Sequence, residues 1–115
     1  MFSFESLAVY QKARNLVKEV YQIQEQFPAE ERYALGDQIR RSITSNIAEG
    51  SGRESCKDKA HFCVIAFGSL MEAFSQLQIA QDLRYISENE VESLRPQFEE
   101  IAKMLSGLKA SFEKI

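Results

Sequence analysis

The chain has 115 residues, of which 44% are hydrophobic and 27% charged, and its formal net charge at pH 7 is -3. A chain of this length forms one domain around one core, and its composition lies away from those of disordered and membrane proteins. No uninterrupted apolar run approaches the roughly 20 residues that cross a bilayer, and residues 1–10 lack the basic run of a signal peptide. We therefore expect a single cytoplasmic domain over residues 1–115, with no membrane partner.

Proline and glycine are rare, and they separate segments that are rich in helix-forming residues. The first segment predicts a helix over about 5–26, which ends at Phe27 because the residue before Pro28 is pushed out of helical geometry. The second segment predicts a helix over about 29–49, which the glycines of the 50–52 stretch close. No alternating strand pattern competes with the helical period.

Two further helices are predicted in the second half of the chain. The third covers about 55–83 and opens with Ser55 and Asp58, whose spacing resembles a capping box. The fourth covers about 88–112, and Pro96 is expected to kink it or to delay its regular start. Four segments of comparable length with short connections favour an antiparallel four-helix bundle, so we predict an all-α fold.

The third predicted helix carries two apolar stripes on different sides, at about 100° per residue. One stripe consists of Phe62, Ile65, Ser69, Ala73 and Ala80. The other consists of Val64, Phe67, Met71 and Phe74. A bundle helix buries one stripe, so the second is either covered by Phe2, Phe4 and the chain termini or free to contact another copy. We interpret it as a candidate oligomer interface.

Several polar side chains fall where the core between the second and third helices is expected. They are Asn46, Glu49, Ser69 and Glu72, with Arg40 as an available counter-charge. Buried polar groups are normally hydrogen-bonded, so we expect them to form a structural network. The alternative is a polar pocket for a small ligand between these helices. Gly68 indicates a close approach between helices, because a glycine inside a helix otherwise only destabilises it.

The chain offers little catalytic chemistry. It has one histidine, His61, so a di-iron bundle site cannot be built, and the sequence offers no Ser-His-Asp arrangement, no paired histidines on one helix face and no zinc set. Cys56 and Cys63 are expected on one helix with their Cα atoms about 10 Å apart by helical rise, too far for a disulfide. We expect reduced thiols, no metal or other cofactor, no small-molecule substrate and no enzymatic activity.

Basic side chains gather around the end of the second predicted helix and the start of the third. They are Arg40, Arg41, Arg53, Lys57 and Lys59. They form the candidate nucleic-acid contacts, although no aromatic residues interleave with them and the net charge of the chain is negative. The alternative is a solvated or interface surface. The stretch 49–53 also resembles a weak anion site ahead of a helix N-terminus, but its glycines are explained by the end of one helix and the start of the next.

Three stretches of the chain match the motifs of one family. Residues 42–50, with the sequence SITSNIAEG, are similar to a signature S-I-x-x-N-I-A-E-G. Phe62, Ala66, Gly68, Ser69 and Glu72 fit a later motif F-x-x-x-A-x-G-S-x-x-E. Phe4, Leu7, Lys12 and Ala13 fit the opening, and Phe27, Pro28, Glu31, Tyr33, Leu35 and residues 38–41 fit the middle. With these motifs the chain resembles the four-helix-bundle proteins encoded in intervening sequences of bacterial large-subunit ribosomal RNA genes.

The resemblance implies a left-handed, up-down-up-down bundle that assembles into a homopentamer without catalytic activity. The related accessory variability determinant protein of diversity-generating retroelements is similar, and it binds nucleic acid and a reverse transcriptase. One departure concerns the arginine pair, because family members usually carry about three more residues between it and Ser42, a rotation of roughly 60° on a helix. Roles of Arg40 and Arg41 therefore do not carry over from relatives.

Three functional hypotheses follow. The leading one is a non-enzymatic, homo-oligomeric assembly or adaptor protein that works with RNA or with an RNA-binding partner. The second is direct nucleic-acid binding through the basic residues. The third is a small-ligand binder, or an enzyme, centred on Asn46, Glu49 and Glu72.

Overall fold

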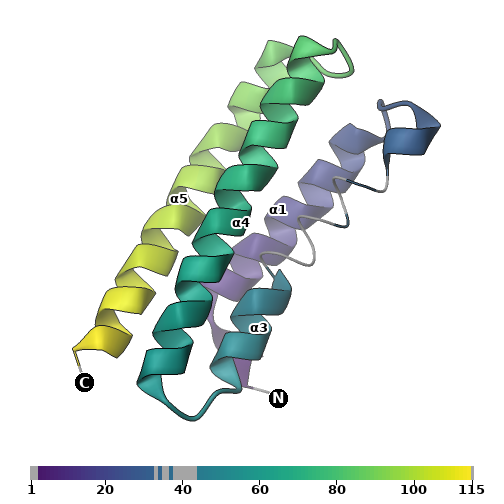
Figure 1. Cartoon of the computed structure of the whole chain (residues 1–115). Coiled ribbons are helices and arrows are strands. Elements are labelled where there is room, and N and C mark those ends of the chain that lie inside the picture. The colour runs from purple at the N-terminus through teal and green to yellow at the C-terminus, as the bar shows by residue number, and fades with distance from the viewer. Residues whose placement is uncertain (1–2, 33, 35–36, 38–43, 115) are drawn as a thin grey trace.

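The computed structural model describes residues 3–32, 34, 37 and 44–114. Within these ranges the protein has four α-helices and no β-strand, which confirms the prediction of an all-α protein. The helices are Ala8–Gln24 (α1), Ser45–Ser51 (α3), Cys56–Asp82 (α4) and Glu88–Glu113 (α5), and short 3-10 turns cover Ser3–Ser6 and Ala29–Glu31. The molecule measures 46 × 22 × 19 Å, and α1, α4 and α5 extend along its length (Figure 1).

Helix α1 begins at Ala8, so the predicted start near residue 5 was wrong. The Ser3–Ser6 turn comes first, and Leu7 in extended conformation separates it from the helix. The ring of Phe4 packs against Tyr10 with its centroid 4.9 Å away, which holds the turn against α1. A periodic apolar pattern does not distinguish such a turn from the first turn of a helix.

The predicted second helix is described near its two ends and also at Arg32, Ala34 and Asp37, which are helical. The Ala29–Glu31 turn follows Pro28, and α3 lies at the other end. Residues 33, 35–36 and 38–43 lie outside the described part of the chain, so a continuous helix over 29–49 stays a prediction.

The prediction that the 50–52 stretch closes a helix is confirmed, because α3 ends at Ser51 and Gly52 is its C-cap residue, whereas Gly50 lies inside the helix. Gly50 is buried, and a Cβ at this position would lie 2.7 Å from the Cβ of Phe62 on α4. A contact that short does not occur between real side chains, so the missing side chain lets α3 approach α4 closely. Gly50 and Phe62, which belong to two separate sequence motifs, are therefore direct neighbours in space. The close approach that the sequence predicted at Gly68 does not occur among the described residues, because a Cβ there would meet nothing within 4 Å.

The two long helices begin at serine caps. The Oγ of Ser55 accepts a hydrogen bond from the backbone N–H of Asp58, at 3.0 Å, as the sequence predicted. Ser87 and Glu90 form a capping box that was not predicted, with each side chain accepting from the other residue's N–H. The N–H of Ser87, together with Gln26, lowers the pKa of Glu90. Pro96 lies inside α5, which starts regularly at Glu88, so the predicted delay was wrong.

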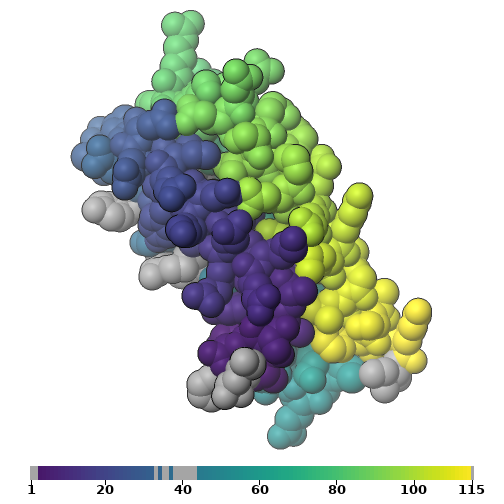
Figure 2. All heavy atoms as spheres, turned by 180° about the vertical axis from the view of Figure 1, so that it is seen from behind, coloured from purple at the N-terminus to yellow at the C-terminus, as the bar shows by residue number. Residues whose placement is uncertain are grey.

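The core consists of a stripe of mainly small residues on α4 that faces larger ones on α5 and α1. The buried residues of α4 are Ala60, Cys63, Ala66, Leu70, Ala73, Leu77 and Ala80. Those of α5 are Val91, Leu94, Phe98, Ile101 and Leu105. Seen from behind, α1 packs along α5 (Figure 2), and polar contacts add to this packing. Lys12 forms an ion pair of 3.0 Å with Glu100, and the side-chain amide of Gln97 donates a hydrogen bond to Glu19.

Two glycines provide a matched test of the α3–α4 contact. Gly50→Ala forces a Cβ against Phe62 and is expected to destabilise the fold by about 1–3 kcal/mol. Gly107→Ala in α5 meets nothing within 4 Å and is expected to stabilise it by about 0.5–1 kcal/mol. Urea denaturation followed by circular dichroism measures both values. Equal effects of the two substitutions would contradict the contact.

Gln24 provides a second test, because it is 3% exposed and its side-chain oxygen is buried without a hydrogen-bond partner. Replacing a buried, unpaired acceptor with an apolar group of similar shape removes a desolvation cost of about 1–3 kcal/mol. We expect Gln24→Met to raise the melting temperature. Gln97→Met removes the hydrogen bond from the Gln97 amide to Glu19 and is expected to lower the melting temperature. A lower melting temperature for Gln24→Met than for Gln97→Met in thermal denaturation would contradict a desolvation cost at the Gln24 oxygen.

Candidate functional site

The exposed apolar surface of the described chain is concentrated on one helix. Six large apolar side chains are exposed among the described residues, and all lie on α4 or on its C-cap residue: Val64, Ile65, Phe67, Met71, Ile79 and Leu83. Val64 is 48% exposed, Met71 42% and Phe67 37%. Large exposed apolar surfaces mark interaction sites in soluble proteins, so these side chains make α4 a candidate interaction surface.

Phe74 was predicted to belong to the same interface, and the structure places it inside the chain instead. It is half-buried, and its ring packs against Phe98 of α5 with the centroids 5.0 Å apart. The guanidinium of Arg95 lies 4.7 Å from the centre of the same ring. The wheel position of Phe74 borders the α5 side of α4, so a contact with α5 was available that the helical pattern alone did not reveal. The predicted interface is reduced to Val64, Phe67 and Met71.

The alternative that the N-terminus covers this surface finds no support from Phe4, which packs on Tyr10 of α1. Phe2 lies outside the described residues. The helical pattern of α4 underestimated the exposed surface, because Ile65, predicted on the core side, and Ile79 and Leu83 are exposed as well. These three residues could have been recognised in the sequence, because the helical period places them outside the stripe of mainly small residues of α4 that is buried.

Two members of the predicted buried network of Asn46, Glu49, Ser69 and Glu72 are not buried in the part of the chain that the structure describes. Glu49 and Glu72 are exposed, and Glu49 pairs with Arg53 at 3.2 Å. Asn46 and Ser69 are half-buried. The prediction failed because the helical period places a side chain on a face but does not say how far the neighbouring helix covers it.

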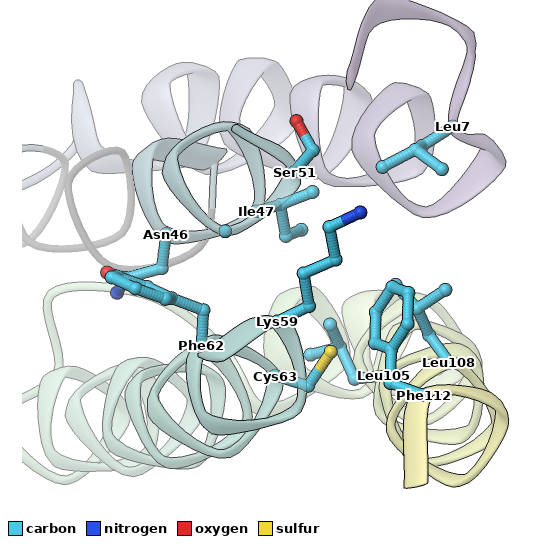
Figure 3. Close-up of a pocket in the computed structure, with 11 residues that line it drawn as sticks. Leu7, Asn46, Ile47, Ser51, Lys59, Phe62, Cys63, Leu105, Leu108 and Phe112 are labelled. Carbon is cyan, nitrogen blue, oxygen red and sulfur yellow. The ribbon is translucent and has the colours of Figure 1, made fainter. Parts of the chain in front are cut away.

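A small cavity lies between α3, α4 and α5, beside Asn46 and Cys63 (Figure 3). Most of its walls are apolar, from Ile47, Phe62 and Leu105 among others. Its volume is about 20 Å³, and a buried water needs roughly 10–15 Å³ of such space. The cavity has room for about one water and not for a substrate, so the small-ligand hypothesis gains no support at Asn46.

The predicted basic patch does not form one free surface. Arg40 and Arg41 lie outside the described residues. Arg53 is engaged twice, because its guanidinium pairs with Glu49 and lies 4.9 Å from the centre of the Phe62 ring. Lys59 extends into the space between α3 and the start of α1 (Figure 3), with its Nζ 5.7 Å from the centre of the Phe112 ring. Lys57 is exposed, and it is the one predicted cation without a described partner.

A groove of about 560 Å³ separates the start of α4 from the end of α5. Its walls include Cys56, Lys57, His61 and Lys109, and Lys109 is neutralised by an ion pair of 3.1 Å with Glu113. Within the described ranges, no group of three or more His, Cys, Asp and Glu side chains is arranged to hold a metal ion. His61 is exposed on α4.

The two cysteine thiols differ in how far they are buried, and we expect them to differ in reactivity for that reason. Cys63 is 6% exposed, and its burial raises the pKa of the thiol, which the positive charge of Lys109 opposes more weakly. Cys56 is half-buried at the start of α4. We expect a thiol reagent such as Ellman's reagent to modify Cys56 first, and Cys63 only on unfolding, as followed by mass spectrometry with Cys56→Ser as the control. Equal rates in the native protein would contradict the burial of Cys63.

Helix α4 is also long and apolar enough to cross a membrane, judged by length and composition alone, with a mean hydropathy of 1.4 over its most apolar window. The sequence predicted no membrane-spanning segment because no uninterrupted apolar run is long enough, and Ser69 and Glu72 interrupt the apolar residues of α4. One such helix is weak evidence for a membrane protein, because core helices of soluble proteins have the same properties.

A family model described as 23S rRNA-intervening sequence protein matches residues 5–107, which include α1, α3, α4 and most of α5. No curated protein matches the chain. The matched range contains the Gly50–Phe62 contact and all six exposed apolar side chains.

Proposed function

We propose a function for this chain from the premise that it belongs to the family of 23S rRNA-intervening sequence proteins. It acts as a non-enzymatic homo-oligomer that serves as an assembly or adaptor module. The family's description associates its members with intervening sequences of 23S rRNA, so the proposed cargo of the assembly is RNA or an RNA-binding protein.

One observation carries the proposal, namely the exposed apolar surface of α4. Val64, Phe67 and Met71 project from a helix whose opposite side already contacts α5 and α3. Fully burying an exposed side chain of this size is worth about 1.5–3 kcal/mol, and because these three are 37–48% exposed in one chain, burying the remainder gains less than half of that each. A second copy offers the same kind of surface, so self-association removes it from water.

The finer features of the proposal come from the family resemblance. They are a left-handed bundle with up-down-up-down order, five copies per assembly and a cytoplasmic location. The proposed protein uses no cofactor, membrane or small-molecule substrate.

Direct nucleic-acid binding is the weaker alternative. Arg53 and Lys59 are already occupied by Glu49, Phe62 and Phe112, and releasing them would cost those contacts. Binding through free surface cations would fall steeply with salt and would weaken when Lys57 is replaced by alanine. Filter binding with a 23S rRNA fragment at two salt concentrations measures this directly.

Solution mass tests the assembly itself. Light scattering is expected to give a multiple of the chain mass of 13.2 kDa, five on the family expectation, that persists at high salt because the contact is apolar. Phe67→Ser is expected to reduce the mass toward that of one chain. Ala110→Ser, at an exposed position on α5, is the control and is expected to leave it unchanged. A monomeric wild type at micromolar concentration would exclude the proposal.

A further inference from the structure

A groove of about 210 Å³ lies at the end of the molecule where α4 ends and α5 begins. The Ala29–Glu31 turn lies at the same end, far from the first residues of α1 and the last residues of α5 (Figure 1). Ile79 and Leu83 of α4 contribute one wall, and Phe27 and Tyr85 contribute a second, with their ring centroids 5.7 Å apart. The groove is therefore built from segments that are distant in the sequence, all of them in one chain.

The wall on α4 is apolar and open to solvent. Ile79 and Leu83 are each 53% exposed, which makes them the most exposed large apolar side chains among the described residues. Pockets that enclose small molecules measure about 300–1,000 Å³, so this groove suits a few side chains of a docked segment rather than a whole ligand. Ile79 lies about 12 Å farther along α4 than Met71 and about 80° around the helix from it. The groove is therefore separate from the surface that we propose for self-association.

Carboxylates lie beside the apolar walls. Glu31 lines the groove, and its Oε1 accepts a hydrogen bond of 3.5 Å from the hydroxyl of Tyr85. Desolvation, and then the negative charges of Glu31 and Glu30, raise the pKa of that hydroxyl, so both carboxylates lie near the Tyr85 wall. Glu30 and Glu31 are exposed, and neither forms an ion pair with a basic side chain in the described part of the chain. The rim of the groove therefore carries negative charge that no described cation neutralises.

The whole end of the molecule around the groove is acidic. Residues 25–32 and 82–90 contain six acidic side chains and two basic ones, Arg32 and Arg84. The Nε of Arg32 donates a hydrogen bond of 3.2 Å to the backbone carbonyl of Phe27. Residues 53–59, at the start of α4, contain three basic side chains and two acidic ones. Negative charge is therefore concentrated at the groove end, where it attracts cationic groups.

An RNA strand and a second copy of the chain both fit this groove less well than a foreign segment. An RNA backbone would bring its phosphates against Glu30 and Glu31, and like charges repel. A second copy would have to supply free cations, whereas Lys12, Arg53 and Lys109 already form ion pairs within the chain. A foreign segment with apolar side chains and its own lysines or arginines matches both the apolar walls and the negative rim.

We propose that this groove, with Ile79, Leu83 and Tyr85 in its walls and Glu30 and Glu31 at its rim, binds a basic amphipathic segment of a protein partner. Apolar side chains of the segment enter the groove, as in other complexes of amphipathic helices with apolar grooves, and its lysines or arginines face the carboxylates. This inference rests on the adaptor part of the proposed function and names the surface that holds the partner. Proteins that bind RNA carry segments rich in Lys and Arg, which suits them to this groove.

Fluorescence anisotropy with labelled synthetic peptides tests the proposal. The probe is a short peptide with leucine and lysine at helical spacing, and two matched peptides replace every lysine by glutamate or every leucine by serine. The leucine–lysine peptide is expected to bind, and each matched peptide is expected to bind about tenfold more weakly, because it lacks one of the two attractions. Equal affinity for the probe and either matched peptide, or no binding of the probe, would overturn the proposal.

Two variants of the protein locate the binding site. Leu83→Ser removes exposed apolar surface and is expected to weaken binding of the leucine–lysine peptide about fivefold. Glu30→Lys reverses a rim charge and is expected to weaken it about fivefold at low salt and less at high salt. Glu54→Lys makes the same charge change at an exposed position just before α4, and this matched control is expected to leave the affinity unchanged. An equal loss for Glu54→Lys and Glu30→Lys would overturn the role of the rim.

Light scattering on the same samples separates this proposal from the proposed assembly. The walls of the groove belong to one chain, so peptide binding is expected at any solution mass. A monomer that binds the peptide overturns the assembly alone, and a multimer that does not bind it overturns the groove alone. A reduced solution mass for Leu83→Ser would place another copy in the groove and overturn the foreign partner. Circular dichroism checks the fold of each variant, and Ile79→Ser replaces Leu83→Ser if that variant unfolds.

Discussion

The structure depends on the narrow stripe of mainly small side chains along α4. Ala66, Ala73 and Ala80 alternate with Leu70 and Leu77, and this alternation lets the larger residues of α5, such as Phe98 and Ile101, pack closely against the helix axis. A small residue also allows close approach near the start of α4, where Gly50 of α3 lies directly against Phe62. Close approach on one side of α4 joins α3 and α5 to this helix, and α1 packs on α5.

That arrangement has a consequence for the rest of α4. A helix whose neighbours contact only one narrow stripe keeps the remainder of its circumference exposed, and here the remainder carries Val64, Phe67, Met71, Ile65, Ile79 and Leu83. In a helix selected only for a monomeric bundle, polar residues would occupy these positions. The composition of α4 is therefore better explained by contacts with other molecules than by the needs of one chain.

Several charged side chains of the protein are paired with one another. Arg53 pairs with Glu49 and stacks on Phe62, Lys109 pairs with Glu113, and Lys12 pairs with Glu100. Exposed pairs of this kind contribute little stability, about 0–1 kcal/mol each. They nevertheless reduce the free positive charge that an RNA backbone would meet. This distribution is consistent with the proposed adaptor, which would assemble through the exposed apolar surface of α4 and contact RNA through a partner.

The sequence by itself predicted the helical segments of α1, α4 and α5, the Ser55 cap and the apolar character of α4, because helical periodicity, capping residues and turn residues are local properties of the chain. Only the tertiary structure decided which of those apolar side chains are covered. It placed Phe74 against Phe98, left Ile65 exposed, and gave Gly50 the role of a contact rather than a helix end. In the structure Arg53 and Lys59 also contact residues outside the predicted basic patch, namely Glu49 and Phe62 for Arg53 and Phe112 for Lys59. Coverage depends on where the neighbouring helices lie, and the order of residues within one helix does not contain that information.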